Sequence, residues 1–304
     1  MSLTGNNLRM AIYYDDIRRI SRNDGAPLYV FNVLKNQLGY DAYHLIPNAE
    51  WLKGWGKFDL NFWVDWGCDA LGGIIDYVPI PTPMPGIYWT SDTHLGFDYR
   101  LARAKQTHQD GGHVFAMQKR AVEEFAAAGV PALWLPHAVE PKAYPKITAI
   151  KDYDVCFIGN INSQNRIDFL DHMFKAFPNF FFGRRLFEEA AAVFGRSKII
   201  LHHSIKDDIA MRVFEALATG SFLLCNDIPT LSELFQDGVH LVTFKTLDEA
   251  VDKAKYYLAH DAEREKIAAA GYAEVIAKHT YRHRVEKILE TVGIKQKEPE
   301  LCLK

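Results

Sequence analysis

The sequence has little that would direct it to nucleic acid, a membrane or the secretory pathway. Its formal net charge is −3, so no overall basic field draws nucleic acid to it. No apolar run reaches the roughly 18 residues of a membrane span, and residues 1–10 lack the apolar core of a signal peptide. The four cysteines stand far apart, without the paired spacing of a metal site. We therefore expect a reduced, cytoplasmic protein with no membrane span and no metal.

What the sequence does contain is a regular alternation of short apolar runs and helical periodicity. Hydrophobic residues make up 48% and charged residues 24% of the 304 residues, which is typical of a soluble globular protein. The alternation predicts parallel β-α-β units. The predicted strands are residues 10–14, 42–46, 60–64, 86–90, 113–117, 132–136, 153–159, 179–183, 198–204, 221–226 and 240–244. The predicted helices are residues 26–39, 119–129, 164–176, 185–194, 208–219, 229–236, 246–259, 261–278 and 280–292.

The pattern is interrupted once, near the middle of the chain. Residues 141–151 hold two prolines and no clear period, so we interpret them as a linker between two α/β domains. The first domain is then residues 1–140, and the second begins at residue 152. Ligands of open α/β sheets bind beyond the carboxyl ends of the strands. The polar residues that follow predicted strands are Asp16, Asp65, Ser91–His94, His137, Asn160, Arg184–Arg185, His202–Ser204 and Asp227.

One segment places two charges inside an otherwise apolar helix. On a helix over 208–219, Asp208, Arg212, Glu215 and Thr219 form a single polar stripe. The pair at i and i+3 could be a simple ion pair, worth a few tenths of a kcal/mol. It could also bind a ligand, because arginine suits phosphate and a carboxylate suits a ribose diol. In that case the helix N-terminus at 207–209 would add N–H donors for an anion.

The phrases around this segment resemble a known family. "MRVFEALATGSFLLCNDIPTLSELFQDG" and the later "HTYRHR" are similar to the C-terminal half of GT-B glycosyltransferases. The resemblance is greatest to the CgeB-like, spore-maturation group related to glycosyltransferase family 4. It is dense over 208–290 and looser in the first domain, through "YYDD", "IYWTSDTH" and "DYDVCFIGN". The resemblance implies two Rossmann-like lobes with a deep interdomain cleft, a nucleotide-sugar domain over 152–279, and a C-terminal helix in 280–304 that crosses back to the acceptor-side domain.

The resemblance also implies roles for individual residues. Glu215 would be the second acid of an E-x7-E pattern and hold the ribose. The first acid falls on Asp207, where aspartate is one methylene shorter than the family's glutamate, which puts its reach to the sugar in doubt. Arg212 would contact the diphosphate, and Gly159 and Asn160 would approach the phosphates through backbone amides. The further donor-side candidates are His203 and Arg184. Arg166 and Arg185 are in reserve, because a charged side chain is expected at the surface.

For the chemistry itself the candidates lie mainly in the first domain. Asp92 and His94 would face the donor sugar, and Arg212 would stabilise the leaving diphosphate. An inverting reaction would need a base, whereas a retaining reaction, which we favour, would need Asp92 or His94 only to orient the sugar. Asp16, Asp65, Trp66 and Trp89 are the acceptor-side candidates.

The predicted function is therefore a metal-independent glycosyltransferase that uses a nucleoside diphosphate sugar, such as a UDP or GDP sugar, and no permanently bound cofactor. Two alternatives remain open: a nucleotide-sugar 2-epimerase of the same fold, and a non-catalytic nucleotide-sugar-binding module. A polysaccharide, a protein, a small molecule and a modified nucleic-acid base are all compatible with the sequence as acceptors. "DYD" at 152–154 matches a metal motif of another glycosyltransferase class, but it precedes a strand where that motif should follow one.

Overall fold

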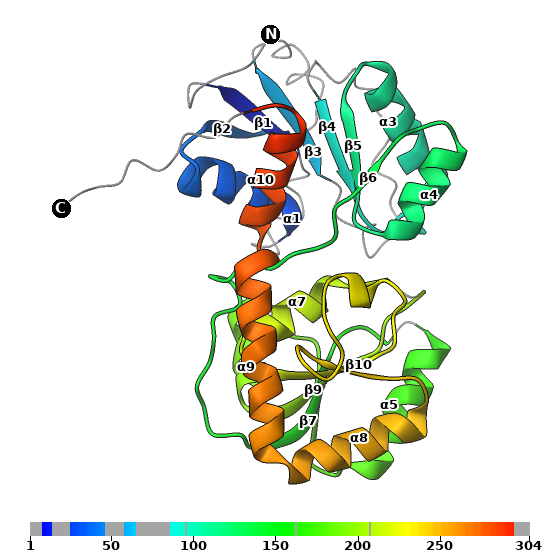
Figure 1. Ribbon diagram of the computed structural model, residues 1–304, viewed down its shortest axis with the longest axis vertical. Coiled ribbons are helices and arrows are strands. Elements are labelled where there is room, and N and C mark those ends of the chain that lie inside the picture. The colour runs from blue at the N-terminus through cyan, green and yellow to red at the C-terminus, as the bar shows by residue number, and fades with distance from the viewer. Residues whose placement is uncertain are drawn as a thin grey trace, which may run out of the picture. The chain divides into compact units, whose positions relative to one another are not determined.

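The computed structural model describes residues 8–13, 25–45, 58–64, 86–94, 96–161, 163–206 and 208–294. Within them the chain forms two compact units (Figure 1). One unit comprises the described parts of Met1–Pro136 and Tyr281–Lys304, and the other is His137–Thr280.

The first unit holds a parallel sheet in the order β2-β1-β3-β4-β5-β6. Its strands are β1 (Arg9–Tyr13), β2 (Asp41–Leu45), β3 (Leu60–Val64), β4 (Gly86–Thr90), β5 (His113–Ala116) and β6 (Leu133–Trp134). Its helices are α1 (Ala26–Asn32), which continues as a π-helix over Val33–Gln37, α3 (Phe97–Gln109), α4 (Lys119–Ala127) and α10 (Tyr281–Thr291). Helix α10 packs against α1, with the rings of Tyr281 and Tyr29 5.0 Å apart.

The second unit holds a parallel sheet in the order β11-β10-β9-β7-β8. Its strands are β7 (Tyr153–Ile158), β8 (Phe180–Gly183), β9 (Ser197–His202), β10 (Phe222–Asn226) and β11 (Val242–Phe244). Its helices are α5 (Gln164–Ala176), α6 (Phe187–Gly195), α7 (Met211–Ala218), α8 (Leu247–Ala259) and α9 (Asp261–Lys278), with a 3-10 turn at Leu231–Glu233. The prediction of two Rossmann-like lobes is confirmed, because each unit is a parallel sheet with helical crossovers. The predicted cleft between them stays a prediction.

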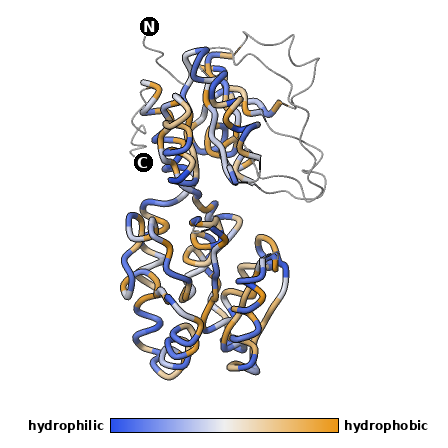
Figure 2. Tube along the Cα trace, turned by 90° about the vertical axis from the view of Figure 1, so that its right-hand side faces the viewer, coloured by the Kyte–Doolittle hydropathy of each residue, from blue (hydrophilic) through white to orange (hydrophobic). Residues whose placement is uncertain are grey.

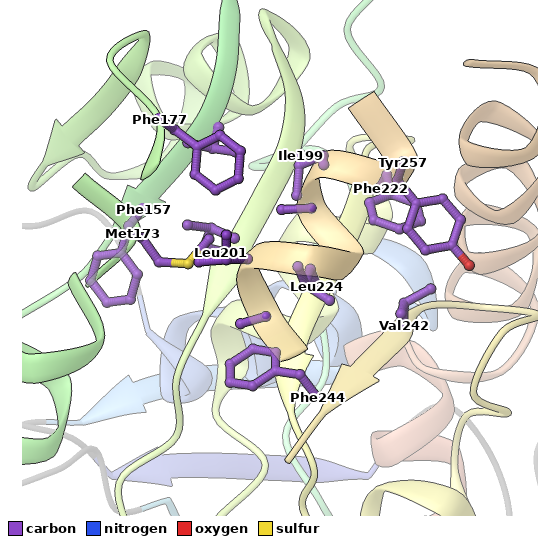
Figure 3. Close-up of a cluster of buried hydrophobic side chains, with 14 of the residues drawn as sticks. Phe157, Met173, Phe177, Ile199, Leu201, Phe222, Leu224, Val242, Phe244 and Tyr257 are labelled. Atoms are coloured by element: carbon purple, nitrogen blue, oxygen red, sulfur yellow. The ribbon is translucent and has the colours of Figure 1, made fainter. Parts of the chain in front are cut away.

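Strands β7, β9 and β10 of the second unit bury side chains on both faces. Along β9, Ile199 and Leu201 enter the apolar cluster beneath α5 and α8, which Figure 3 shows. Because successive strand residues point to opposite faces, Ile200 and His202 face α6 and α7 instead. Figure 2 shows hydrophobic and hydrophilic stretches interspersed along the trace of both units.

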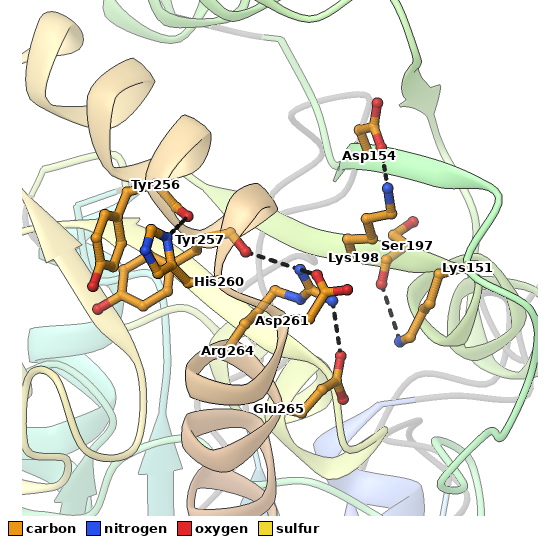
Figure 4. Close-up of polar contacts among 10 residues, drawn as sticks. All are labelled: Lys151, Asp154, Ser197, Lys198, Tyr256, Tyr257, His260, Asp261, Arg264 and Glu265. Carbon is orange, nitrogen blue, oxygen red and sulfur yellow. Dashed lines mark hydrogen bonds and ion pairs between the residues drawn. The ribbon is translucent and has the colours of Figure 1, made fainter.

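A buried arginine fastens the junction of α8 and α9. The Nη1 of Arg264 donates to the carbonyl oxygen of Tyr257 at 2.8 Å and to Asp261 at 2.6 Å, while Nη2 reaches Glu265 at 3.2 Å (Figure 4). These bonds replace the water that the guanidinium loses on burial. The turn between the two helices is therefore fixed by side-chain contacts.

Two predicted helices were wrong in their bounds or type, and one helix was missed. The helix expected over 208–219 begins only at Met211, because the carbonyl of Asp208 accepts from the Ser204 hydroxyl and its N–H bonds Ile205, forming a turn instead. The helix expected over 229–236 is a single 3-10 turn. Helix α3 was not predicted at all.

Candidate functional site

The carboxyl ends of β7 and β9 form the switch point of the second sheet. From β7 the chain crosses through α5 to β8, whereas from β9 it crosses through α7 to β10 on the other face. Such a reversal leaves a crevice beyond the strand ends where α/β proteins bind ligands. Gly159 and Asn160 follow β7, and His203 follows β9. The structure therefore brings these three predicted donor-side residues to one sheet edge.

Arg166, in the first turn of α5, joins the two strand ends. Its Nη1 donates to the carbonyl oxygen of Asn160 at 2.8 Å, and its Nε donates to that of His203 at 3.0 Å. Arg166 is only 8% exposed, so the expectation of a surface charge was wrong. Across the described part of the chain no carboxylate forms an ion pair with it. Burial lowers the pKa of its guanidinium, which nevertheless stays charged because an arginine pKa starts so high.

The Arg212–Glu215 pair lies on α7, one turn from the helix start. Arg212 Nη1 is 2.8 Å from Glu215 Oε2, and the two side chains are 18% and 2% exposed. The i,i+3 ion pair is thus present, and it is buried. Burial, and then the negative charge of the nearby Glu215, raise the pKa of the Tyr144 hydroxyl. The predicted helix N-terminus at 207–209 was wrong, since α7 starts at Met211, and Asp207 lies outside the described residues.

His202, the last residue of β9, is a neutral histidine in the interior. Burial, together with the positive charges of Arg166 and Arg212, lowers its pKa to about 3. Its Nε2 has no hydrogen-bond partner among the residues described. The neighbouring His203 lies between aromatic rings, 5.0 Å from Phe169 and 6.3 Å from Phe244 between ring centroids. The two histidines therefore occupy different surroundings, as their alternation along the chain predicts.

A pocket of about 460 Å³ opens beside His203. It lies where β10 and β11 end and α8 begins, and the Asn226 side chain on its rim accepts the backbone N–H of Ser204 at 2.6 Å. Aromatic, amide and charged groups thus meet in one hollow at the same sheet edge. The lining residues are His203, Asn226, Asp227, Phe244, Lys245, Thr246 and Leu247.

In the first unit the turn after β4 has an unusual backbone. Asp92 has a φ of +46°, a left-handed conformation that residues other than glycine adopt rarely and at some cost. The Nε of Arg100 holds the turn by donating to the carbonyl oxygen of Ser91 at 2.7 Å. His94 lies two residues beyond Asp92 on the same turn. Strained turns of this kind are frequent at functional sites.

Residues 147–290 match the family model described as glycosyl transferase-like. This segment is therefore similar to glycosyltransferase domains. Similar solved structures include HepE from Anabaena in complex with UDP and glucose, at 13% identity over 94% of this chain and 99% of that one, with a TM-score of 0.63. An α-glucosyltransferase in complex with UDP and a DNA containing an HMU base is similar at 9% identity over 94% and 99%, with a TM-score of 0.67.

Sucrose-phosphate synthase from Thermosynechococcus elongatus gives 9% identity over 94% and 98%, with a TM-score of 0.64. At such identities the likeness shows a shared fold. No curated protein matches the chain.

Other predicted residues lie away from the switch point or carry other contacts. The prediction that Trp89 lies on the acceptor side was wrong, because this residue is fully buried. Its Nε1 donates to the carbonyl oxygen of Leu135 at 2.9 Å. Arg184 and Arg185 are exposed on the turn after β8. Asp16, Asp65 and Trp66 lie outside the described residues.

Both acids of "DYD" form ion pairs with basic side chains of the second unit. Asp152 pairs with Arg196, and Asp154 is 2.7 Å from Lys198 (Figure 4 shows the second pair). Within the described ranges, no group of three His, Cys, Asp or Glu residues is placed to hold a metal ion. Over the same ranges no helix is long and apolar enough to cross a membrane.

Sequence reasoning missed Tyr144 and the pocket residues Asn226, Phe244 and Lys245. The pocket residues carried a usable signal, because Asn226 ends β10, Phe244 ends β11 and Lys245 follows it. Tyr144 carried none, since it lies in the segment interpreted as a linker. Only the tertiary structure shows that the Tyr144 side chain lies near Glu215 of α7.

Proposed function

We propose that the protein is a glycosyltransferase that moves a sugar from a nucleoside diphosphate donor to an acceptor, without a metal ion and with retention at the anomeric carbon. The observation that carries the proposal is the positive charge at the carboxyl edge of the second sheet. Arg166 is buried there without a carboxylate partner and donates to two backbone carbonyl oxygens, while Arg212 on α7 pairs with Glu215. A buried cation without a carboxylate partner, as Arg166 is, favours an anionic ligand.

In this proposal the donor diphosphate binds at the ends of β7 and β9. Gly159 and Asn160 supply backbone amides, and Arg212 turns from Glu215 toward the phosphates. The freed oxygen of Glu215 then accepts from the ribose. His203, Arg184 and Asp207 complete the donor side. The HepE structures in complex with UDP and UDP-glucose support uracil as the base of the donor and glucose as a first sugar to test.

The reaction breaks the bond between the anomeric carbon and the diphosphate oxygen, and forms a bond from that carbon to the acceptor oxygen on the same face. Negative charge grows on the leaving diphosphate, where Arg212 stabilises it. The acceptor proton passes to the leaving oxygen. Asp92 and His94 orient the sugar, and Asp16, Asp65 and Trp66 serve the acceptor.

The test is calorimetric titration with UDP, GDP and ADP, each with magnesium and with chelator. We expect UDP to bind with a dissociation constant near micromolar, about −8 kcal/mol, equally well with chelator. UDP-glucose should then be hydrolysed slowly, or transferred when an acceptor is supplied. Absence of binding by every diphosphate would exclude the proposal. Conversion of the sugar without an acceptor would favour the epimerase, and binding without any turnover would favour the binding module.

A further inference from the structure

Arg103 is a buried cation of the first unit that has aromatic neighbours but no hydrogen-bond acceptor. Its side chain lies in the middle of α3 and is 7% exposed. The guanidinium carbon lies 3.7 Å from the centre of the Trp63 ring and 5.6 Å from that of the Tyr99 ring. Its Nε has no hydrogen-bond partner, and within the described residues no carboxylate forms an ion pair with it.

The two aromatic rings do not satisfy the hydrogen-bonding groups of this side chain. A ring attracts a cation through its face, whereas the five N–H groups of a guanidinium point outward in the plane of the group. A stacked arginine therefore keeps its donors free at its edge. Because a buried charge is stable only when it is paired or hydrogen-bonded, Arg103 requires an acceptor that the described residues do not supply.

The other buried arginines show what is missing at Arg103. Five arginines are buried in the described part of the chain. The other four each donate a hydrogen bond to a backbone carbonyl oxygen; they are Arg100, Arg166, Arg264 and Arg284. The protein thus has a regular way of satisfying a buried guanidinium, and Arg103 departs from it.

Arg103 lies close to the carboxyl edge of the first sheet. One turn earlier on the same face of α3, Arg100 donates from Nε to the carbonyl oxygen of Ser91, in the turn after β4, at 2.7 Å. Trp63, under the guanidinium, is the last residue but one of β3. Because ligands of open parallel sheets bind beyond the carboxyl ends of the strands, the arginine lies at the edge where a ligand is expected.

Two further buried polar atoms at this edge have no partner. They are the Oγ1 of Thr93, in the turn after β4, and the Oε1 of Gln118, which follows β5. The two side chains are 0% and 5% exposed. Strands β4 and β5 are neighbours, with Thr90 opposite Ala116, so both residues follow adjacent strand ends. Buried polar groups nearly always have a partner in native proteins, and together with the guanidinium these atoms indicate a ligand.

We propose that Arg103 is the centre of an anion-binding site that takes an acidic group of the acceptor, either a phosphate ester or a carboxylate. The inference rests on the proposed function, which assigns the acceptor to the first unit. A planar guanidinium suits both groups, because its parallel N–H bonds match two oxygen atoms. Trp63 covers one face of the guanidinium, and the Thr93 hydroxyl offers a further donor. A neutral acceptor would leave the buried cation unpaired.

The test observes the Nε–H of Arg103 by nuclear magnetic resonance in protein saturated with UDP, which keeps the probes out of the donor site. The signal is assigned from its contacts with the Trp63 ring, so that no variant has to fold. Inorganic phosphate and acetate represent the two acidic groups. We expect one of them to shift the signal saturably with a dissociation constant of about 1 mM, and the tighter one identifies the acidic group. Glycerol, which carries no charge, should leave the signal unchanged.

Lys105→Gln is the matched control for Arg103→Gln, because it removes the same charge from an exposed position of α3. In a calorimetric titration with the tighter anion, Arg103→Gln should weaken binding at least about 10-fold, and Lys105→Gln should weaken it less than about 2-fold. Equal losses in the two variants, or no saturable shift of the Arg103 signal with either anion, would overturn the inference and leave the glycosyltransferase proposal standing. Failure of UDP to bind would instead remove the proposed function, and the anion could still be titrated without UDP.

Discussion

The guanidinium of Arg166 has exchanged water for two backbone carbonyls. Glutamine at this position can form at most some of these hydrogen bonds to the carbonyl oxygens of Asn160 and His203. An unpaired buried carbonyl costs about 1–3 kcal/mol. We therefore expect Arg166→Gln to lower the free energy of unfolding by about 2 kcal/mol. Urea denaturation measures it. Arg185→Gln, on an exposed arginine, should stay within about 0.5 kcal/mol of wild type; equal effects would show that the Arg166 bridge contributes nothing particular.

Arg212 and Glu215 should differ in the step they affect. Glu215→Ala should weaken UDP binding by one to two orders of magnitude, about 1.4–2.8 kcal/mol, in a calorimetric titration. Normal binding would show that the ribose assignment is wrong.

Arg212→Ala should lower kcat with UDP-glucose more than it weakens donor binding, because charge on the diphosphate grows in the transition state. Steady-state kinetics and calorimetry on the same variant separate the two effects. Arg196→Ala is the control, since Arg196 pairs with Asp152 on the surface. Equal losses in kcat and in affinity for Arg212→Ala would indicate ground-state binding alone.

His202 gives the stability a dependence on pH. Its pKa is about 3 when folded and about 6.5 when unfolded, so between these values only the unfolded state takes up the proton. The free energy of unfolding therefore falls as the pH falls, by up to about 1.4 kcal/mol per pH unit from this group. In His202→Phe the slope between pH 6 and pH 4 should be shallower by about that amount. Urea denaturation at several pH values measures it, and an unchanged slope would contradict the assignment.

At the scale of elements, helix α9 packs closely against neighbouring segments at Gly271. A Cβ there would lie 2.2 Å from the carbonyl oxygen of His240 and 2.8 Å from a methyl of Leu217 on α7. Overpacking of this kind costs about 1–3 kcal/mol, more than the roughly 1 kcal/mol that alanine gains over glycine in a helix. Gly271→Ala should therefore lower the free energy of unfolding, as measured by urea denaturation. Ala269 is exposed on the same helix, so Ala269→Gly measures the effect of helix propensity alone. A higher free energy of unfolding in Gly271→Ala than in wild type would contradict the close packing.

Which elements could be predicted depends on how their buried faces are built. The strands β3 and β4 were found because every buried position is apolar or aromatic, apart from Asn61 and Thr90. Helix α3 escaped notice because its buried residues, at the usual helical spacing, are Arg100, Arg103, Ala104 and Thr107. Helical periodicity is recognised from apolar residues, whereas two of the buried residues of α3 are arginines. Arg103, for example, lies 3.7 Å from the Trp63 ring centroid.

The candidate site could also be predicted only in part, because the sequence reveals residues at strand ends but not contacts made by tertiary packing. A rule about strand ends leads from the sequence to Asn160, His203 and Asp92, because each follows a recognisable strand. Tyr144 is close to Glu215 only through tertiary packing across 71 positions of sequence, roughly the length of half a domain. Nothing local in the sequence records such a contact, so the supporting residues of the site had to come from the structure.

At the scale of the whole molecule, structural similarity and sequence similarity cover different lengths. The shared fold extends over 94% of the chain at 9–13% identity, whereas the family model covers residues 147–290. A fold survives many substitutions that keep pattern and volume, so the first unit can retain its topology after its sequence signal has faded. The matched segment is the part that contains Arg166, Arg212 and Glu215.

Each unit has its own hydrophobic core. A substitution that destabilises one unit should therefore leave the stability of the other unchanged. The ring of Tyr281, fully buried, lies 5.0 Å from Tyr29 and 6.0 Å from Trp89. Tyr281→Ala should destabilise the first unit by about 3–5 kcal/mol, as for other large aromatic deletions. Hydrogen exchange should then speed up in β1 and β4 but not in β7 and β9, while exposed Arg282→Ala changes neither. Faster exchange in both sheets would show that the units unfold together, so that donor binding could not be studied apart from the first unit.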